Sequence, residues 1–322
     1  MQLLAAAAIV LAALGQASPV AVRFDTSEAD AVLGADWSQV TSTIGYQRLK
    51  ARELSMGRAF DEEAFRRFVE SDDTSRRAGE LRRTVDAWTR ADLSSAVALA
   101  LRYLPPAASI RATIYPVIKP QGNSFVFETN TNPAIFISLD PSKTPDQIEN
   151  TIAHELHHIG LASLGPGYEK SLSRFSPEAQ AVGKWLTAFG EGLAMLAAAG
   201  GPDVHPHAVS PASDRQRWDR DLANFPSDLA KVQQFFFDVL DHKLTGDQVQ
   251  QTAMNFFGIQ GPWYTVGWKM AAIVEQTFGR EAVIQGTDDP RVLLGNYNRA
   301  IRERKLDLPL WSERILLAVG SQ

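Results

Sequence analysis

Two histidines and a glutamate within residues 154–158 have the types and the spacing of a metal site. His154 and His158 are four residues apart, so on a helix they lie one above the other and both imidazoles can reach one metal ion. Glu155 is turned about 100° away from His154 and is free to act as a base on a water molecule. The pattern is typical of hydrolases that use Zn²⁺, and we expect one zinc ion per chain.

The residues around this pattern predict the helix that carries it. Thr144 is suited to be the N-cap, Pro145 the first helical residue and Gln147 the partner of Thr144 in a capping box. We expect Gly160 and then Gly165-Pro166-Gly167 to mark the end of the helix. An apolar stripe lies nearly opposite the two histidines and consists of Ile148, Ile152, Leu156 and Ile159. One side of the helix should therefore pack on a core while the other faces a cleft.

The composition limits both the class of protein and the kind of site. The chain has 322 residues, of which 45% are hydrophobic and 21% are charged, so it can bury a substantial core as one large domain or two lobes. A net charge of -5 argues against a nucleic-acid partner. Because the chain has no cysteine, disulfides and cysteine zinc sites are excluded, and a metal must be held by histidine and carboxylate.

Residues 1–17 have the composition of an export signal. They carry no charged side chain, contain a long apolar run and end on Gly15-Gln16-Ala17, which has small residues at both positions that a signal peptidase reads. The run is too short to span a membrane, and no later run is long enough. We therefore expect the chain to be exported to a periplasm or out of the cell, and to be soluble after cleavage.

Three successive parts are expected within one domain of residues 18–322, and together they make an α+β fold that is mainly helical. Helical signals dominate from about 25 to 105 and include one amphipathic run at 36–54. Between about 106 and 163, short β-branched or aromatic runs at 109–118, 124–128 and 134–138 predict a small, mostly antiparallel sheet, followed by the helix of His154. An edge strand of that sheet beside a metal site would be able to pair with an extended substrate backbone. The part from about 176 to 322 is helical again.

Glu191 is a further candidate metal ligand. It is the only polar side chain in residues 188–199, within a helix expected to run from Ser176 to Gly200. An ionised carboxylate buried without a partner costs several kcal/mol, so a positive group should lie against it. A metal ion fits that need, and a buried salt bridge to an arginine or lysine is the alternative. Gly190 and Gly192 would let this helix approach another backbone closely.

These motifs together give the chain a family resemblance. With the pattern at 154–158, the run Glu191-Gly192-Leu193-Ala194 and the run Tyr264-Thr265-Val266-Gly267, it resembles the gluzincin group of zinc peptidases. More narrowly, it is similar to uncharacterised zinc-dependent peptidase families that carry H-E-x-x-H, E-G-x-A and Y-x-x-G. The resemblance covers about residues 109–278 and implies a zincin-like fold.

The resemblance also implies a role for each residue of the motifs. His154, His158 and Glu191 would be the zinc ligands. Glu155 would be the general base, and Tyr264 a hydrogen-bond donor to the oxyanion. Arg215 and Arg217 are weaker candidates for that donor.

The chain departs from the thermolysin-like members in two ways. The gap between His158 and Glu191 is longer than in those enzymes. They place an aspartate four residues after the ligand glutamate, where this chain has Met195. The residue that orients the imidazole of His154 is therefore unassigned, and Asp140 and Asp203 are the candidates.

Two sets of alternatives remain at this stage. His205 and His207 could supply the third ligand in place of Glu191, although a solvent-exposed turn is favoured for that segment. The function that the motifs favour is a peptidase acting on peptides or proteins. The other classes are an exported binding or scaffold protein with a structural zinc site, and a zinc amidase acting on a non-peptide or cell-wall amide. Glu155 argues against a purely structural site, which needs no base.

Overall fold

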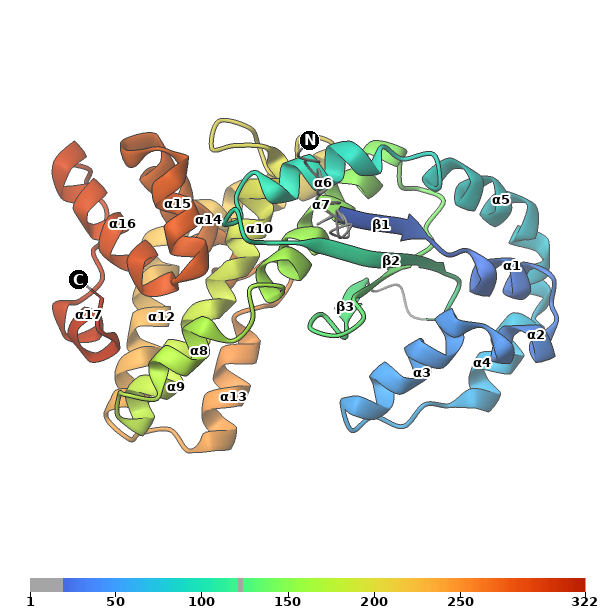
Figure 1. The fold of residues 1–322 in the computed structure, drawn as a ribbon, viewed down its shortest axis with the longest axis horizontal. Helices are drawn as coiled ribbons and strands as arrows, with labels where there is room; N and C mark the ends of the chain where they lie inside the picture. The colour runs from blue at the N-terminus through green and yellow to red at the C-terminus, as the bar shows by residue number, and fades with distance from the viewer. Residues whose placement is uncertain (1–19, 121–123, 322) are drawn as a thin grey trace, which may run out of the picture.

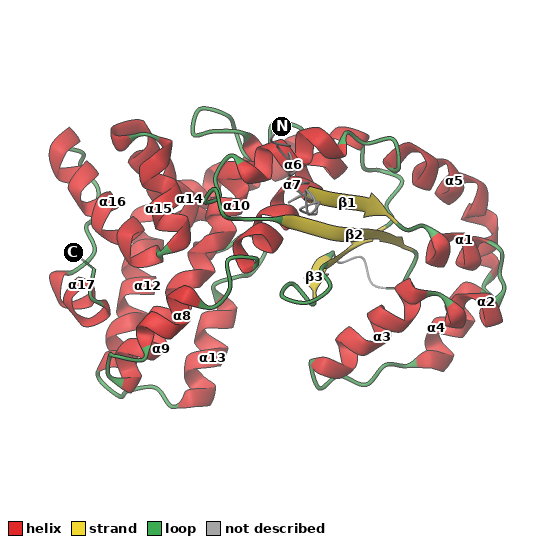
Figure 2. Cartoon of the chain, in the orientation of Figure 1, coloured by secondary structure: helices red, strands yellow, loops and turns green. Residues whose placement is uncertain are grey.

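The computed structural model describes residues 20–120 and 124–321, and its N-terminal and C-terminal parts lie at opposite ends of the molecule (Figure 1). The expected export signal at 1–17 lies outside the described residues. Helices account for most of the described chain, and one small sheet lies near its middle (Figure 2). The prediction of a mainly helical α+β fold is confirmed.

The sheet has four strands, in the spatial order β1-β2-β4-β3. The strands are β1 (Val20–Phe24), β2 (Ile110–Val117), β3 (Phe125–Phe127) and β4 (Ala134–Ser138). β1 pairs with β2 and β2 with β4 in parallel, and only β3 and β4 are antiparallel. The expectation of a mostly antiparallel sheet is therefore wrong. β1 and β2 are parallel because a long helical crossover connects them. β2 and β4 are parallel because β4, and not the next strand β3, lies beside β2.

Six helices make up that crossover. They are α1 (Ser27–Leu33), α2 (Trp37–Ser42), α3 (Ile44–Ser55), α4 (Glu62–Val69), α5 (Asp72–Trp88) and α6 (Leu93–Leu101). The run expected as one helix at 36–54 is divided at Thr43, whose backbone is extended and whose hydroxyl accepts a hydrogen bond from the N–H of Tyr46. Thr43 is thus the N-cap of a new helix.

Helix α7 (Pro145–Ala162) carries both histidines and begins as the sequence predicts. Thr144 and Gln147 form the capping box, with Pro145 in the first turn. All four residues of its apolar stripe are buried. Gly160 does not end the helix, which continues to Ala162. A Cβ at Gly160 would lie 2.3 Å from Leu104 and 3.3 Å from Ile110, so this glycine lets α7 pack closely on the sheet.

The remaining helices form the C-terminal part. They are α8 (Gly167–Leu172), α9 (Pro177–Leu186), the short 3-10 helix η1 (Thr187–Phe189), α10 (Gly190–Ala199), α11 (Ala212–Ala223), α12 (Phe225–Leu240), α13 (Gly246–Asn255), α14 (Pro262–Phe278), α15 (Arg280–Asp288), α16 (Pro290–Arg304) and α17 (Glu313–Val319). The single helix expected at 176–200 is divided by η1, and α8 lies outside the parts that the sequence predicts to be helical. No helix in the described parts of the chain is both long and apolar enough to cross a bilayer.

Two hydrophobic cores meet at α7 and α10. The first core contains the sheet, α6 and the apolar stripe of α7. The second contains most of α10 together with α12, α14 and α16. Asn150 of α7 donates a hydrogen bond to the carbonyl of Ala198 of α10 at 3.0 Å. Tyr103, which follows α6, packs in the second core, where its hydroxyl donates to Glu275 of α14 at 2.9 Å. The helix of the two histidines is therefore held firmly against the helix of Glu191.

The position of α10 also depends on close backbone packing against α14. A Cβ at Gly192 would lie 2.1 Å from the backbone nitrogen of Trp268 and 2.5 Å from the carbonyl oxygen of Tyr264. A Cβ at Gly267 would lie 2.6 Å from the carbonyl oxygen of Phe189. Backbone atoms of a packed helix cannot rotate away, so both positions require glycine.

Gly192→Ala should therefore destabilise the fold strongly. We expect a loss of about 3 kcal/mol or more in the free energy of unfolding, because the added methyl group must push α10 and α14 apart. Gly190→Ala is the matched control, since nothing lies within 4 Å of its Cβ position. It should be neutral or stabilising by up to about 1 kcal/mol through helix propensity. Urea denaturation of both variants gives the comparison, and equal stability would contradict the close packing.

A buried carboxyl group anchors α1 against the end of β2. Glu28 is fully buried and accepts a hydrogen bond from the N–H of Ile118 at 3.3 Å. Burial raises the pKa of Glu28 from 4.5 to about 8, although this hydrogen bond and the charge of Lys119 act in the opposite direction. The folded protein therefore holds this proton across the neutral range.

Stability should consequently fall as the pH rises from about 4.5 to about 8. The folded state keeps the Glu28 proton over this window while the unfolded state has lost it, so the contribution is fully present below pH 4.5 and lost towards pH 8. The slope is at most about 1.4 kcal/mol per pH unit. Glu28→Gln should flatten this dependence in urea denaturation, and the exposed Glu303→Gln should not. An unchanged slope in Glu28→Gln would contradict the assignment.

Candidate metal site and adjoining cleft

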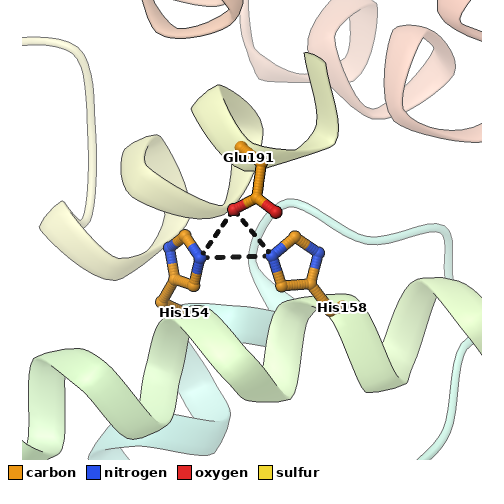
Figure 3. A group of neighbouring side chains, drawn as sticks. All are labelled: His154, His158 and Glu191. Atoms are coloured by element: carbon orange, nitrogen blue, oxygen red, sulfur yellow. Dashed lines mark hydrogen bonds and ion pairs between the residues drawn. The ribbon is translucent and has the colours of Figure 1, made fainter. Parts of the chain in front are cut away.

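Three side chains from two helices converge on one point. His154 and His158 project from one face of α7, and Glu191 projects towards them from the first turn of α10 (Figure 3). The Nε2 atom of His154 lies 3.1 Å from Oε2 of Glu191 and 3.1 Å from Nε2 of His158. The third distance, from Nε2 of His158 to Oε2 of Glu191, is 3.3 Å. Among the described residues this is the one group with the donor types and spacing to hold a metal ion.

The triangle has the size that zinc requires. Nitrogen and oxygen ligands lie about 2.0 to 2.1 Å from zinc, so two ligands of a tetrahedral ion are roughly 3.3 to 3.4 Å apart. The three observed distances are within about 0.3 Å of that separation. Two imidazoles and one carboxylate also leave a fourth position open, which is the arrangement of hydrolytic zinc sites. The residues present therefore fit a zinc ion.

Electrostatics at the three side chains favour a cation at their centre. Burial alone would raise the pKa of Glu191, but His158 and hydrogen bonds from both histidines outweigh it and hold that pKa well below its usual range. Burial would lower the pKa of His158, and Glu191 instead raises it to about 9. In the described part of the chain no lysine or arginine forms an ion pair with Glu191. The alternative of a buried salt bridge to such a residue is thus not what the structure shows.

Glu155 is next to the two histidines and is partly buried. Burial is the main cause that raises the pKa of Glu155, and repulsion by Glu191 adds to it, while His154 and His158 act in the opposite direction. A carboxylate with a raised pKa is a better proton acceptor at neutral pH than an ordinary glutamate. The environment of Glu155 therefore suits a general base.

Tyr264 comes to the same site from the first turn of α14. Its ring stacks on the ring of His154, with centroids 6.4 Å apart and planes inclined by 14°. Burial, followed by the charge and hydrogen bonding of Glu191, raises the pKa of Tyr264. The phenol therefore stays protonated and can donate a hydrogen bond. The close packing of α14 on α10 explains how a residue 73 positions after Glu191 reaches this site.

The two aspartates considered as partners of His154 do not contact it. Asp140 accepts hydrogen bonds from the N–H and the hydroxyl of Ser142, and Asp203 accepts one from Gln276. Both assignments are wrong, because each carboxylate is engaged elsewhere. Nδ1 of His154 is buried and has no hydrogen-bond partner among the described residues.

The histidines considered as alternative ligands lie outside the metal group. His207 is hydrogen-bonded through its two ring nitrogens to Ser210 at 3.0 Å and to Gln260 at 2.8 Å. His205 lies 3.1 Å from Asp219. His157 also belongs to α7, but the helix geometry turns it away from the shared face, and its side chain is fully buried. Of the candidates for the third ligand, the structure brings only Glu191 to the two histidines.

A cleft of about 460 Å³ begins at His154 and Tyr264. One wall comes from α7 and the segment before it, and includes Asp140, Lys143, Gln147, Asn150 and Thr151. The other wall comes from the segment after α10, α11 and the turn before α14, and includes His207, Ser210, Asp214, Arg217 and Gln260. Sequence reasoning missed Asp214 and Gln260, because nothing local links them to the metal motif.

β3 is an edge strand of the sheet and contacts α7, but its residues do not line this cleft. Addition of a substrate strand to the sheet therefore stays a prediction.

The two arginines considered as alternative donors to the oxyanion differ in position. Arg217 lines the cleft that begins at the metal site. Arg215 instead donates a hydrogen bond to the carbonyl of Ala208 at 3.1 Å. Only Arg217 of the two therefore lies where it can meet a substrate in this cleft.

Comparison with known proteins agrees with this site. No curated protein and no solved structure matches the chain. A family model described as "Putative zinc dependent peptidase (DUF5700)" matches residues 37–306, a span that contains the three converging side chains, Glu155 and Tyr264. Because the match covers most of the sequence, the chain belongs to this family.

Proposed function

We propose that this protein is an exported peptidase that binds one zinc ion through His154, His158 and Glu191 and hydrolyses peptide bonds. The observation that carries the proposal is the triangle of ligand atoms, with separations of 3.1, 3.1 and 3.3 Å, which fits one face of a zinc tetrahedron. The match to the peptidase family supports the same activity. The uncharged apolar segment at 1–17 supports export.

Glu155 would act as the base of the reaction. Zinc, when bound, supplies a Lewis acid that polarises the scissile carbonyl group and lowers the pKa of water. Glu155 takes a proton from the attacking water and returns it to the leaving amine. Its burial and raised pKa suit both steps, because the carboxyl group must accept the proton and then release it near neutral pH.

Tyr264 would stabilise the negative charge that develops on the carbonyl oxygen. Its phenol is held beside His154 by ring stacking and stays protonated, so it can donate a hydrogen bond to that oxygen. The donor is already in place before the reaction, which is the condition for such a bond to lower the barrier.

Glu155→Gln should abolish cleavage without loss of the metal. Because a side-chain amide cannot accept the proton, we expect kcat to fall by about 100-fold to 10,000-fold while zinc content stays at one per chain. Glu149→Gln, on the same helix but outside the metal group, is the matched control. Elemental analysis and turnover of an unbiased peptide library provide the measurements.

Three other results would redirect this proposal. Zinc in both proteins with no cleavage by the wild type would favour a binding protein or a non-peptide amide as substrate. Absence of zinc from the wild type would show that the site has been misread. Full zinc content in a Glu191→Gln variant would remove Glu191 from the ligand set.

Tyr264→Phe should slow the chemical step and leave metal binding intact. Loss of one donor to the oxyanion typically costs about 3 kcal/mol of transition-state stabilisation, so we expect kcat to fall by about 100-fold or more with little change in KM. Steady-state kinetics and zinc content of the variant test this. A change confined to KM would assign Tyr264 to substrate binding.

A further inference from the structure

The cleft beside the metal site follows one face of α7. It is lined by four residues of this helix: Gln147, Asn150, Thr151 and His154. They are at positions i, i+3, i+4 and i+7, which lie along a single face of a helix. The cleft therefore extends from His154 towards the N-terminus of α7. A substrate that reaches His154 along this face must pass the opposite wall, which α11 helps to form.

Asp214 and Arg217 of α11 are both part of that wall. They are three residues apart and form an ion pair of 3.0 Å between Nη1 of Arg217 and Oδ1 of Asp214. About a third of each side chain is exposed. The pair fixes one end of the guanidinium group, so Arg217 is held in place before any ligand arrives.

The guanidinium group still has an unused donor. Nε of Arg217 is buried and has no hydrogen-bond partner among the described residues. Buried N–H groups are nearly always paired, so this one leaves the donors of Arg217 incompletely used in a side chain that lines the cleft. A planar guanidinium group with one edge engaged by Asp214 can present the remaining N–H groups to a second carboxylate.

His207 and Asp140 do not compete for this role. Burial lowers the pKa of His207, although its hydrogen bond with Gln260 acts in the opposite direction, so His207 is uncharged at neutral pH. The carboxylate of Asp140 accepts two hydrogen bonds from Ser142. Lys143 lines the facing wall and brings a second positive charge to the same cleft.

We propose that Arg217 binds a carboxylate group of the substrate and so determines which peptides are cleaved. This inference rests on the proposed peptidase function, because it concerns the cleft of the same metal site. Two parts of a peptide carry this chemistry: the carboxylate at its C-terminus, and the side chain of an aspartate or glutamate. Recognition of the first would restrict cleavage to the end of a chain, and recognition of the second would direct it to acidic sequences.

Four pools of mixed-sequence peptides of equal length separate these sources. The pools combine a free or amidated C-terminus with the presence or absence of aspartate and glutamate. The wild type, Arg217→Gln and Arg217→Lys are compared by kcat/KM on each pool. Arg220→Gln is the control, because Arg220 is exposed on the same helix and its loss changes the net charge equally.

We expect the wild type to prefer a pool that carries the recognised carboxylate over its neutral counterpart by about 10-fold to 100-fold. Arg217→Gln should abolish that preference, so that kcat/KM on the pool with the carboxylate falls to the value on its neutral counterpart. Arg217→Lys should restore only part of it, because lysine keeps the charge but not the fork of donors. Arg220→Gln should behave as the wild type. Zinc content and thermal unfolding show whether each variant is folded.

Retention of the same pools on immobilised Glu155→Gln protein, with and without Arg217→Gln, measures recognition independently of turnover. Retention that favours the carboxylate and depends on Arg217, in a protein whose wild type cleaves nothing, would support the inference and reject the peptidase function. Cleavage by the wild type with equal rates on all pools, unaffected by Arg217→Gln, would overturn the inference and leave the peptidase function standing. Equal retention of all pools would also overturn it.

Discussion

The contact between α7 and α10 is the interaction on which the site depends. It places one carboxylate, from the second hydrophobic core, within 3.3 Å of two imidazoles that belong to a helix of the first core. Neither helix contains a complete set of ligands. The position of α10 against α14 is in turn fixed by Gly192 and Gly267, where the two helices touch backbone to backbone. A metal ion bound here would join the two halves of the molecule.

Burial then gives the same few side chains their chemical properties. Glu191 remains ionised because two histidines face it, whereas Glu155 has its pKa raised, chiefly by desolvation. The pKa values of these two neighbouring carboxyl groups are thus shifted in opposite directions. The low pKa of Glu191 suits it to bind a cation, and the raised pKa of Glu155 suits it to accept a proton. Tyr264 stays protonated for a related reason, since it is buried beside a negative charge. The difference between these groups comes from their positions and not from their residue types.

The sequence by itself determined the elements that are encoded locally. The capping box at Thr144 and Gln147, the apolar stripe of α7 and the spacing of His154 and His158 are each specified within a few residues, and the structure shows them as expected. Glu191 could be selected because a lone carboxylate in an apolar helix needs a partner. Tyr264 was suggested by family resemblance alone, since no local rule connects it to the metal motif.

Tertiary structure decided everything that depends on contacts between distant segments. The sheet is mainly parallel because β1 pairs with β2 across about 85 residues of helical chain, and pairing over that distance has no signature within either strand. Gly160 is locally typical of a helix end, but packing against Leu104 keeps it inside α7. The partners proposed for His154 failed because the positions of Asp140 and Asp203 depend on loops. Asp214, Arg217 and Gln260 line the cleft with His154 only through the folding of α11 and of the turn before α14, so this cleft could not be predicted from the sequence.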